Sequence, residues 1–290
     1  MRVDPSRVAI AEVRGGVAAT ESASNRGASV PLGPIGAIER PATSLPSSTR
    51  TPLSLRVELA TGAVPSGADY ADRVLREIEA RVQRGQAARV VFDLDNTAFD
   101  TRPRTLAALR SFDASNGTSY FARLTNDQVE RDGGATATAL GLAPDIVARV
   151  ASHWERTFWD GRNFVHDEAV PEVAELAWRA KRAGAEVVYL TGRIEALRRP
   201  SVEALEREGF PSADNVVLKP DLSVKTHAFK AQWLSNAKDH GVFVGWYLTD
   251  SGREIEGMLQ HRPDLPCVRV DHPLGRDGGS KLTVPVLALG

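Results

Sequence analysis

The chain has 290 residues, of which 42 % are hydrophobic and 25 % are charged, and its formal net charge at pH 7 is −1. These values are ordinary for a globular protein with a real core, arranged as one large domain or two smaller ones. They exclude an overall basic field that would attract nucleic acid or an anionic membrane, although they leave room for local basic patches.

The first part of the chain differs in composition from the rest. From Gly15 to about Ser54 it is rich in Ala, Ser, Pro, Gly and Thr, and hydrophobic periodicity is weak. Such a segment has too little apolar surface to fold on its own. We therefore expect residues 1–54 to form a flexible N-terminal extension, with a processed or targeting segment as the alternative.

Strand and helix signals alternate along the remaining chain. A helical spacing of apolar residues runs from about Ala68 to Gly85, and the apolar run 89–93 ends in an acid and reads as a buried strand. Further strands are expected at 186–190, 215–218, 242–248 and 267–270, the last being the final strand. Helices are expected from Pro171 to Gly184, through Val202 and Leu205 to Gly209, and from Thr226 to His240. This alternation predicts an α/β fold, a parallel sheet with helices on both faces.

The interval between the first two strands is too long for one crossover, because about 30 residues complete a strand–helix–strand unit. The surplus, residues 101–164, contains helical stretches and several aromatic residues. We interpret it as a small helical insertion that leaves the carboxyl end of the first strand. Ligands bind at this edge of parallel sheets, so the insertion is expected to act as a cap. Residues 55–100 and 165–290 then form the core.

Cysteine content and hydropathy bear on where the protein works. Cys267 is the only cysteine, which excludes an intrachain disulfide and fits a reducing compartment. The segment from Met1 to Gly16 has no apolar stretch of signal-peptide length, and no apolar run in the chain could span a bilayer. We expect a cytoplasmic protein without a membrane partner.

Polar residues gather at the predicted strand ends. Asp93 and Asp95 end the first strand, Thr191 the second and Asp250 the fourth, and three lysines lie between the third and fourth, at Lys219, Lys225 and Lys230. Because parallel strands end at one edge of a sheet, these residues are expected to form a single pocket.

The residue types in this pocket suit phosphate ester hydrolysis. That reaction needs a nucleophile, a proton for the leaving oxygen and positive charge for the phosphoryl oxygens. A turn at Asn96-Thr97 would bring Asp93 and Asp95 to one ligand. A carboxylate facing a phosphate needs a cation, and Mg²⁺ is the usual one. Thr191 can donate to a phosphoryl oxygen, as can the amides of Gly192 and Arg193 if a helix begins there, while the Arg193 guanidinium could bind phosphate bidentately.

Four motifs resemble the haloacid dehalogenase superfamily of phosphatases over roughly Arg89 to Asp271. They are Asp93-Leu94-Asp95-Asn96-Thr97, Tyr189-Leu190-Thr191-Gly192-Arg193, Phe229-Lys230-Ala231 and Leu248-Thr249-Asp250-Ser251-Gly252-Arg253-Glu254. The resemblance implies a three-layer, Rossmann-like parallel sheet with a small helical cap, and an acid-phosphatase-like hydrolase.

The resemblance also implies a role for each motif residue. Asp93 would attack phosphorus and form an aspartyl-phosphate, and Asp95 would protonate the leaving group and later activate water. Mg²⁺ would be held by Asp93, the backbone carbonyl of Asp95, and Asp250, while Thr191 and a lysine would hold the phosphoryl group. Dehalogenase members lack a second acid at the Asp95 position, so its presence favours phosphate chemistry.

Several choices stay open at this point. Lys230 is preferred as the motif lysine over Lys225 and Lys219. Glu254 either reaches the metal or the lysine, or is a solvated helix residue. Arg104 is interpreted as facing water rather than the cap interface, and Asp167 as a residue that only shapes the cap hinge.

The substrate is expected to be a small phosphorylated metabolite or a nucleotide. One alternative is a polynucleotide 3′-end phosphatase, against which the near-neutral charge weighs. The other is a non-catalytic scaffold with a binding role. The sequence does not indicate the oligomeric state.

Overall fold

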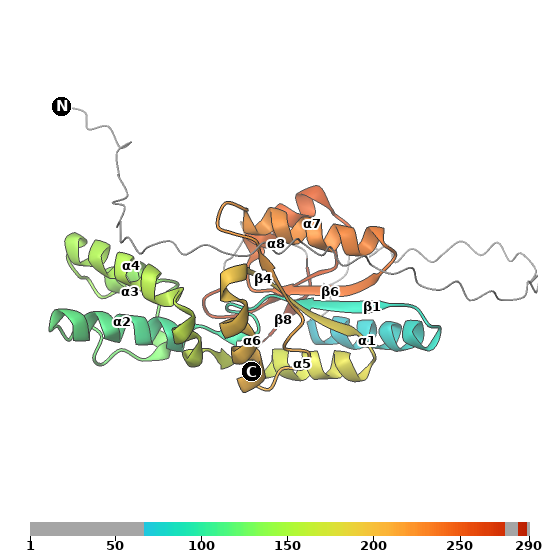
Figure 1. Cartoon of the computed structure of the whole chain (residues 1–290), viewed down its shortest axis with the longest axis horizontal. Coiled ribbons are helices and arrows are strands. Elements are labelled where there is room, and N and C mark those ends of the chain that lie inside the picture. Colours follow the sequence, from blue (N-terminus) through green and yellow to red (C-terminus); the bar gives the residue numbers. More distant parts are fainter. Residues whose placement is uncertain (1–66, 276–283, 289–290) are drawn as a thin grey trace, which may run out of the picture. The chain divides into compact units, whose positions relative to one another are not determined.

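The computed structural model of the protein describes residues 67–275 and 284–288 (Figure 1). The expected flexible extension, residues 1–54, lies outside the described residues. Within the described ranges no helix is both long and apolar enough to cross a bilayer.

A parallel sheet forms the centre of the described chain. Its strand order is β5-β4-β1-β6-β7-β8, and every neighbouring pair is parallel. The strands are β1 Ala88–Phe92, β4 Glu186–Ile194, β5 Val216–Lys219, β6 Phe243–Thr249, β7 Cys267–Val270 and β8 Val286–Leu287. The expectation that residues 267–270 form the final strand is wrong, because β8 follows. Its two residues are too few to show a hydrophobic period.

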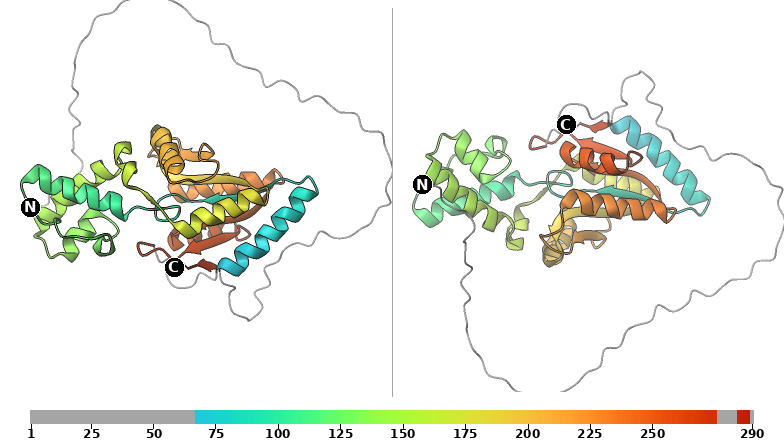
Figure 2. Two further views of the ribbon diagram at one scale, coloured as in Figure 1. Left: turned by 90° about the horizontal axis from the view of Figure 1, so that it is seen from below. Right: turned by 90° about the horizontal axis from the view of Figure 1, so that it is seen from above.

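Helices cover both faces of this sheet, which confirms the predicted α/β fold with three layers (Figure 2). One face packs against α1 Gly67–Gln83, α5 Pro171–Arg182 and α6 Arg198–Arg207. The other packs against α7 Thr226–Asp239 and α8 Gly252–His261. Figure 2 shows α1 in cyan and α5 in yellow on the side away from α7 in orange.

The strands are apolar on both faces, as a covered parallel sheet requires. In β1, Val90 and Phe92 enter the core beneath α1 and α5, whereas Val91 enters the core beneath α7 and α8. All three side chains are fully buried. The strand therefore ends at Phe92 in the middle of the sheet, and Asp93 is the first residue beyond it.

An irregularity in β6 changes which residues face α7 and α8. Arg89 pairs with Val244, but Val91 pairs with Tyr247, so β6 contains one extra residue. Gly245 lies in this bulge, where a Cβ atom would be 2.6 Å from Cγ1 of Val74. The bulge turns Tyr247 toward α7 and α8, on the side opposite Trp246.

The helical insertion leaves and rejoins the core through two short strands. β2 Phe99–Asp100 and β3 Glu168–Ala169 pair antiparallel. Between them lie α2 Arg102–Asn116, the 3-10 helix η1 Asn126–Gln128, α3 Gly133–Ala139, α4 Pro144–Phe158 and the 3-10 helix η2 Gly161–His166. These helices have their own apolar core around Leu109, Phe112 and Phe121 and lie together in Figure 1. We propose that this segment is the cap expected from the sequence.

Candidate functional site

A tight turn follows β1 and carries the two acids of the first motif. Asn96 adopts a left-handed conformation with φ 57°, which asparagine tolerates better than most residues. Its Oδ1 accepts a hydrogen bond from Oγ1 of Thr101 at 2.6 Å. The backbone amide of Leu94 donates to Oδ1 of Asp93 at 2.8 Å. The turn expected at Asn96-Thr97 is therefore present.

A buried ion-pair network, here called the lysine cluster, consists of Asp93, Lys230, Tyr247 and Glu254. The Nζ atom of Lys230 lies 2.8 Å from Oδ2 of Asp93 and 2.8 Å from Oε1 of Glu254. It also donates to the Tyr247 hydroxyl at 2.8 Å, and that hydroxyl donates to Glu254. The cluster joins the end of β1 to α7, β6 and α8, all of which belong to the core.

The three candidate lysines have different surroundings. Lys230 contacts Asp93, and its side chain is 1 % exposed. Lys225 is exposed, and Lys219 donates to the backbone carbonyl of Val224 at 3.1 Å. Lys230 is thus the one of the three that the structure places against Asp93. Glu254, for which two interpretations were open, pairs with this lysine and is not a solvated helix residue.

Burial and charge act on the lysine cluster in opposite directions. Burial raises the pKa of Asp93 to about 6, although Lys230 opposes the shift. Burial alone would lower the pKa of Lys230, but Asp93 and Glu254 hold it above its ordinary value. The Lys230 ammonium group therefore stays charged. The positive charge of Lys230 is not enough to offset the effect of burial on the Asp93 carboxylate.

A second buried network, here called the arginine cluster, consists of Asp95, Arg104, Asp167 and Arg193. Arg193 donates from Nη2 to Oδ1 of Asp95 at 2.7 Å and from Nε to Oδ2 at 3.1 Å. Arg104 donates from Nη2 to the same Oδ1. Asp167 lies between the arginines, with Oδ1 3.0 Å from Nε of Arg104 and Oδ2 2.9 Å from Nη2 of Arg193.

The arginine cluster is electrostatically balanced. The side chains of Arg104, Asp167 and Arg193 are 0 % exposed, and that of Asp95 is 22 % exposed. Burial alone would raise the pKa of Asp95, but Arg193 and Arg104 hold it well below its usual range. Two guanidinium groups thus face two carboxylates, although burial still raises the pKa of Asp167 and lowers that of Arg104.

The placement of Thr191 differs from the expectation. Thr191 was predicted to end its strand, but β4 continues to Ile194. The condition for the Gly192 and Arg193 amides to bind phosphate, a helix that begins there, is not met, because the 3-10 helix η3 Glu195–Leu197 and then α6 follow the strand. The pairing of β4 with β5 is regular to Leu190 and resumes at Ile194, so the intervening residues leave the ladder. Thr191 is fully buried, and its Oγ1 accepts a hydrogen bond from the Arg193 amide at 3.2 Å.

Gly192 lies against the start of α7. A Cβ atom on Gly192 would be 2.9 Å from Cγ2 of Thr226, so any larger residue would force the Thr226 side chain or the backbone to shift. The close approach keeps α7, and with it Lys230, near the end of β4. The structure therefore supports a packing role for Gly192.

Two threonines join the ends of β1 and β6. Oγ1 of Thr249 donates to Oδ2 of Asp93 at 3.1 Å, and the amide of Asp250 donates to Oγ1 of Thr97 at 2.9 Å. Because β1 and β6 are neighbours in the sheet, these bonds hold Asp250 beside the turn that carries Asp93.

The donor set beside Asp93 fits a divalent cation. The carboxylate of Asp250 is buried, and burial together with Asp93 and Glu254 raises its pKa well above the usual value. Among the described residues, none donates a side-chain hydrogen bond to this carboxylate, and no three His, Cys, Asp or Glu side chains form a metal cluster. Two carboxylates and a backbone carbonyl suit Mg²⁺, which usually keeps several water ligands.

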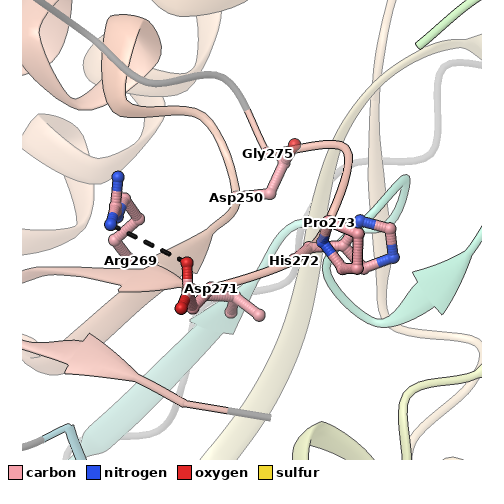
Figure 3. Close-up of a pocket in the computed structure, with 7 residues that line it drawn as sticks. Asp250, Arg269, Asp271, His272, Pro273 and Gly275 are labelled. Atoms are coloured by element: carbon pink, nitrogen blue, oxygen red, sulfur yellow. Dashed lines mark ion pairs between the residues drawn. The ribbon is translucent and has the colours of Figure 1, made fainter. Parts of the chain in front are cut away.

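A cavity of about 360 Å³ adjoins Asp250 at the carboxyl end of β7 (Figure 3). In Figure 3 the ion pair between Arg269 and Asp271, whose charged atoms are 3.9 Å apart, lies on the left, and the ring of His272 lies on the right. Nε2 of His272 lies 3.4 Å from Oδ1 of Asp100 in β2. The cavity is therefore next to Asp250, but neither Asp93 nor Asp95 lines it.

Sequence reasoning missed three residues of the two clusters. Tyr247 reads as an ordinary strand residue, and only the bulge in β6 directs it to Lys230. Arg104 and Asp167 were interpreted as a solvated residue and a hinge residue, because neither belongs to a recognised motif. A signal did exist, since an arginine that opens a helix just beyond an acidic motif is well placed to pair with it.

Solved structures resemble this fold at low sequence identity. A class C acid phosphatase from Bacillus anthracis is 13 % identical, with a TM-score of 0.43 over 74 % of this chain and 84 % of that one. A haloacid dehalogenase-like family hydrolase from Streptococcus pneumoniae is 11 % identical, with a TM-score of 0.48 over 70 % and 93 %. Protein tyrosine kinase A from Mycobacterium tuberculosis is 17 % identical, with a TM-score of 0.45 over 70 % and 95 %. Likeness at this level does not indicate activity, and no curated protein sequence matches the chain.

A family model gives a more specific result. The model of subfamily IIIB of the haloacid dehalogenase superfamily, described as acid phosphatase, matches residues 147–260. The matched stretch contains Thr191, Lys230 and Asp250, while Asp93 and Asp95 precede it. These five residues lie around the ends of adjacent strands β4, β1 and β6, and over residues 147–260 the chain is similar to the acid phosphatases of the haloacid dehalogenase superfamily.

Proposed function

We propose that the protein is a Mg²⁺-dependent phosphomonoester hydrolase that acts through an aspartyl-phosphate on a small phosphorylated metabolite or a nucleotide in the cytoplasm. The observation that carries this proposal is the contact between Asp93 and Lys230 at 2.8 Å, with Asp250 held beside them at the end of β6. A nucleophile and a cation for the phosphoryl oxygens are thus adjacent.

Asp93 is the nucleophile in this proposal. Its Oδ1 accepts the Leu94 amide and its Oδ2 contacts Lys230 and Thr249, so the orientation of the carboxylate is set before a substrate arrives. Attack forms the bond between Asp93 and phosphorus and breaks the bond to the leaving oxygen. Lys230 would neutralise charge on the phosphoryl oxygens, and Thr191 would donate to the same group. The Arg193 guanidinium, expected to bind phosphate, is instead bonded to Asp95, Asp167 and Ser201.

The metal ion would be held by the carboxylates of Asp93 and Asp250 and by the backbone carbonyl of Asp95. When bound, Mg²⁺ supplies positive charge that offsets repulsion between these carboxylates and the phosphate. The raised pKa of Asp250 supports this assignment, because the site as it stands has an excess of buried negative charge.

Asp95 is the acid and base of the proposed reaction. Arg193 and Arg104 hold Asp95 ionised in the substrate-free protein, so in this proposal it carries a proton for the leaving oxygen only after substrate binding has loosened these pairs. It later takes a proton from the water that hydrolyses the aspartyl-phosphate. Its carboxylate accepts from Arg104, in the first turn of α2, so it contacts the start of the insertion. The insertion is therefore the element that would select the leaving group.

The test is phosphate release from p-nitrophenyl phosphate, with and without Mg²⁺. Asp93→Asn is expected to lower kcat by at least about 10³-fold, because an amide does not attack phosphorus. Asp214→Asn is the matched control, since Asp214 is exposed and precedes β5 at the opposite edge of the sheet. Wild-type activity no higher than that of Asp93→Asn, or no dependence on Mg²⁺, would rule out the proposal.

A further inference from the structure

The bulge in β6 brings Tyr247 to the lysine cluster. Successive residues of a strand point to opposite faces of a sheet, so Val244 and Tyr247 would lie on opposite faces of a regular strand. Both instead pack beneath α7 and α8, because the extra residue near Gly245 shifts the alternation by one. The bulge thus directs the Tyr247 hydroxyl toward Lys230.

The Tyr247 hydroxyl makes two hydrogen bonds in an enclosed place. It accepts from Nζ of Lys230 at 2.8 Å and donates to Oε1 of Glu254. The side chain of Tyr247 is fully buried, and that of Lys230 is 1 % exposed. Solvent therefore does not compete for the bond between these two residues.

Three contacts hold the ammonium group of Lys230. An ammonium group has three donors, and Nζ lies 2.8 Å from one oxygen of each of Asp93, Glu254 and Tyr247. With the two carboxylates alone, the flexible lysine side chain could swing about the line that joins their oxygens. The Tyr247 hydroxyl supplies a third contact, which removes this freedom.

The position of Lys230 in turn affects the carboxylate of Asp93. Oδ2 of Asp93 contacts Lys230 and accepts from Oγ1 of Thr249, while Oδ1 accepts from the Leu94 amide. Lys230 is the one charged partner among these three. A shift of its ammonium group toward Glu254 would weaken the hold on Oδ2 and let the carboxylate turn, and small misplacements of a reacting group slow a reaction.

We propose that Tyr247 is a positioning residue, which acts through Lys230 to keep the Asp93 carboxylate oriented for attack on phosphorus. This inference rests on the proposed function, in which Asp93 is the nucleophile. The hydroxyl is bonded to Lys230 and Glu254, so it takes no part in making or breaking bonds to phosphorus. Its loss should therefore lower kcat and leave KM nearly unchanged.

Tyr247→Phe tests this role, because it removes the hydroxyl and keeps the ring, whose centre lies 5.5 Å from Nζ of Lys230. With p-nitrophenyl phosphate and Mg²⁺, we expect kcat per folded molecule to fall about fivefold, as the loss of one buried hydrogen bond implies, and KM to change less than about twofold. Thermal unfolding gives the folded fraction of each variant.

Tyr189→Phe is the matched control. Tyr189 is also fully buried in the sheet, and its hydroxyl donates to the backbone carbonyl of Pro211 at 2.7 Å, in the core beneath α1 and α5. The control removes one buried hydrogen bond away from the lysine cluster. It is expected to lower stability while kcat per folded molecule stays the same.

Combined variants test whether Tyr247 acts through Lys230. Lys230→Met has no ammonium group to position, so adding Tyr247→Phe should lower kcat by less than about twofold more. Glu254→Gln is a second background if Lys230→Met does not fold. There the combined loss should be smaller than the product of the single losses, because both groups hold the same ammonium group.

The outcomes separate this inference from the proposed function. An unchanged kcat per folded molecule in Tyr247→Phe, a loss that appears in KM instead, or the full loss again in the Lys230→Met or Glu254→Gln background would each overturn the inference. Asp93→Asn should abolish turnover whether or not Tyr247 is replaced. Activity that survives Asp93→Asn would instead overturn the proposed function.

Discussion

The lysine cluster and the arginine cluster hold two acids that are separated only by Leu94, yet they are built from different parts of the chain. The lysine cluster takes Lys230, Tyr247 and Glu254 from α7, β6 and α8, all in the core. The arginine cluster takes only Arg193 from the core sheet beside Asp95, and its other two members lie at the ends of the insertion.

The two clusters also differ in charge. In the lysine cluster one ammonium group faces the carboxylates of Asp93 and Glu254, and Asp250 adds a further negative charge nearby. In the arginine cluster two guanidinium groups face two carboxylates. The proposed metal ion would therefore offset an excess of negative charge around the Asp93 carboxylate that the Asp95 carboxylate does not share. In the proposed function, residues of the core hold the nucleophile, and residues at the two ends of the insertion surround the acid.

The largest effect is expected from removing the ammonium group of the lysine cluster. Lys230→Met leaves Asp93 and Glu254 buried without their cation, so we expect kcat to fall by about 10²- to 10³-fold. Loss of one partner of a buried pair also costs roughly 3–5 kcal/mol of the free energy of unfolding. Phosphate release and urea unfolding measure the two effects. Lys225→Met, at an exposed position, should change neither; comparable losses in both variants would contradict the assignment of Lys230.

The second-largest effect is expected from metal binding, which should depend on residues beside the lysine cluster and not on the side chains of the arginine cluster. Mg²⁺ at about 100 times its Kd is expected to add about 2.7 kcal/mol to the free energy of unfolding of the wild-type protein. Asp250→Asn should remove this gain and should stabilise the metal-free protein, because it relieves repulsion with Asp93 and Glu254. Arg104→Lys should keep the gain, since no side chain of the arginine cluster is a proposed metal ligand. Unfolding with Mg²⁺ or EDTA tests this, and an unchanged gain in Asp250→Asn would refute the site.

The smallest effects are expected from deleting one hydroxyl in the lysine cluster and one beside the arginine cluster. Tyr247→Phe removes the group that accepts from Lys230 and donates to Glu254, and Ser201→Ala removes the acceptor 3.2 Å from Nη1 of Arg193. Loss of one buried hydrogen bond is worth about 1 kcal/mol, or roughly fivefold in rate. Tyr247→Phe should slow hydrolysis of phenyl phosphate and p-nitrophenyl phosphate alike. Ser201→Ala should act mainly on phenyl phosphate, because its more basic phenolate needs a proton on departure. An effect of Tyr247→Phe mainly on phenyl phosphate, with equal effects of Ser201→Ala on both substrates, would contradict the different roles proposed for the two clusters.

Much of the site follows from rules that act along the sequence. The apolar run before Asp93 predicts a strand buried on both faces, and parallel connections place successive motifs at one edge of the sheet. For this reason Asp93, Asp95 and Asp250 could be assigned to one pocket before their distances were known. Thr191 was placed in the right strand but at the wrong point, because a break in the pairing of β4 with β5 leaves no mark in hydrophobic periodicity.

The sequence by itself determined the α/β alternation, the helical insertion and the acids that follow β1 and β6, because these depend on local periodicity and on the order of strands. Only the tertiary structure decided that Lys230 contacts Asp93, that a bulge turns Tyr247 toward Glu254, and that Arg104 and Asp167 meet at Asp95. Such pairings join segments that are far apart in the chain. They depend on the angle at which helices and strands pack, which no local pattern of residues encodes.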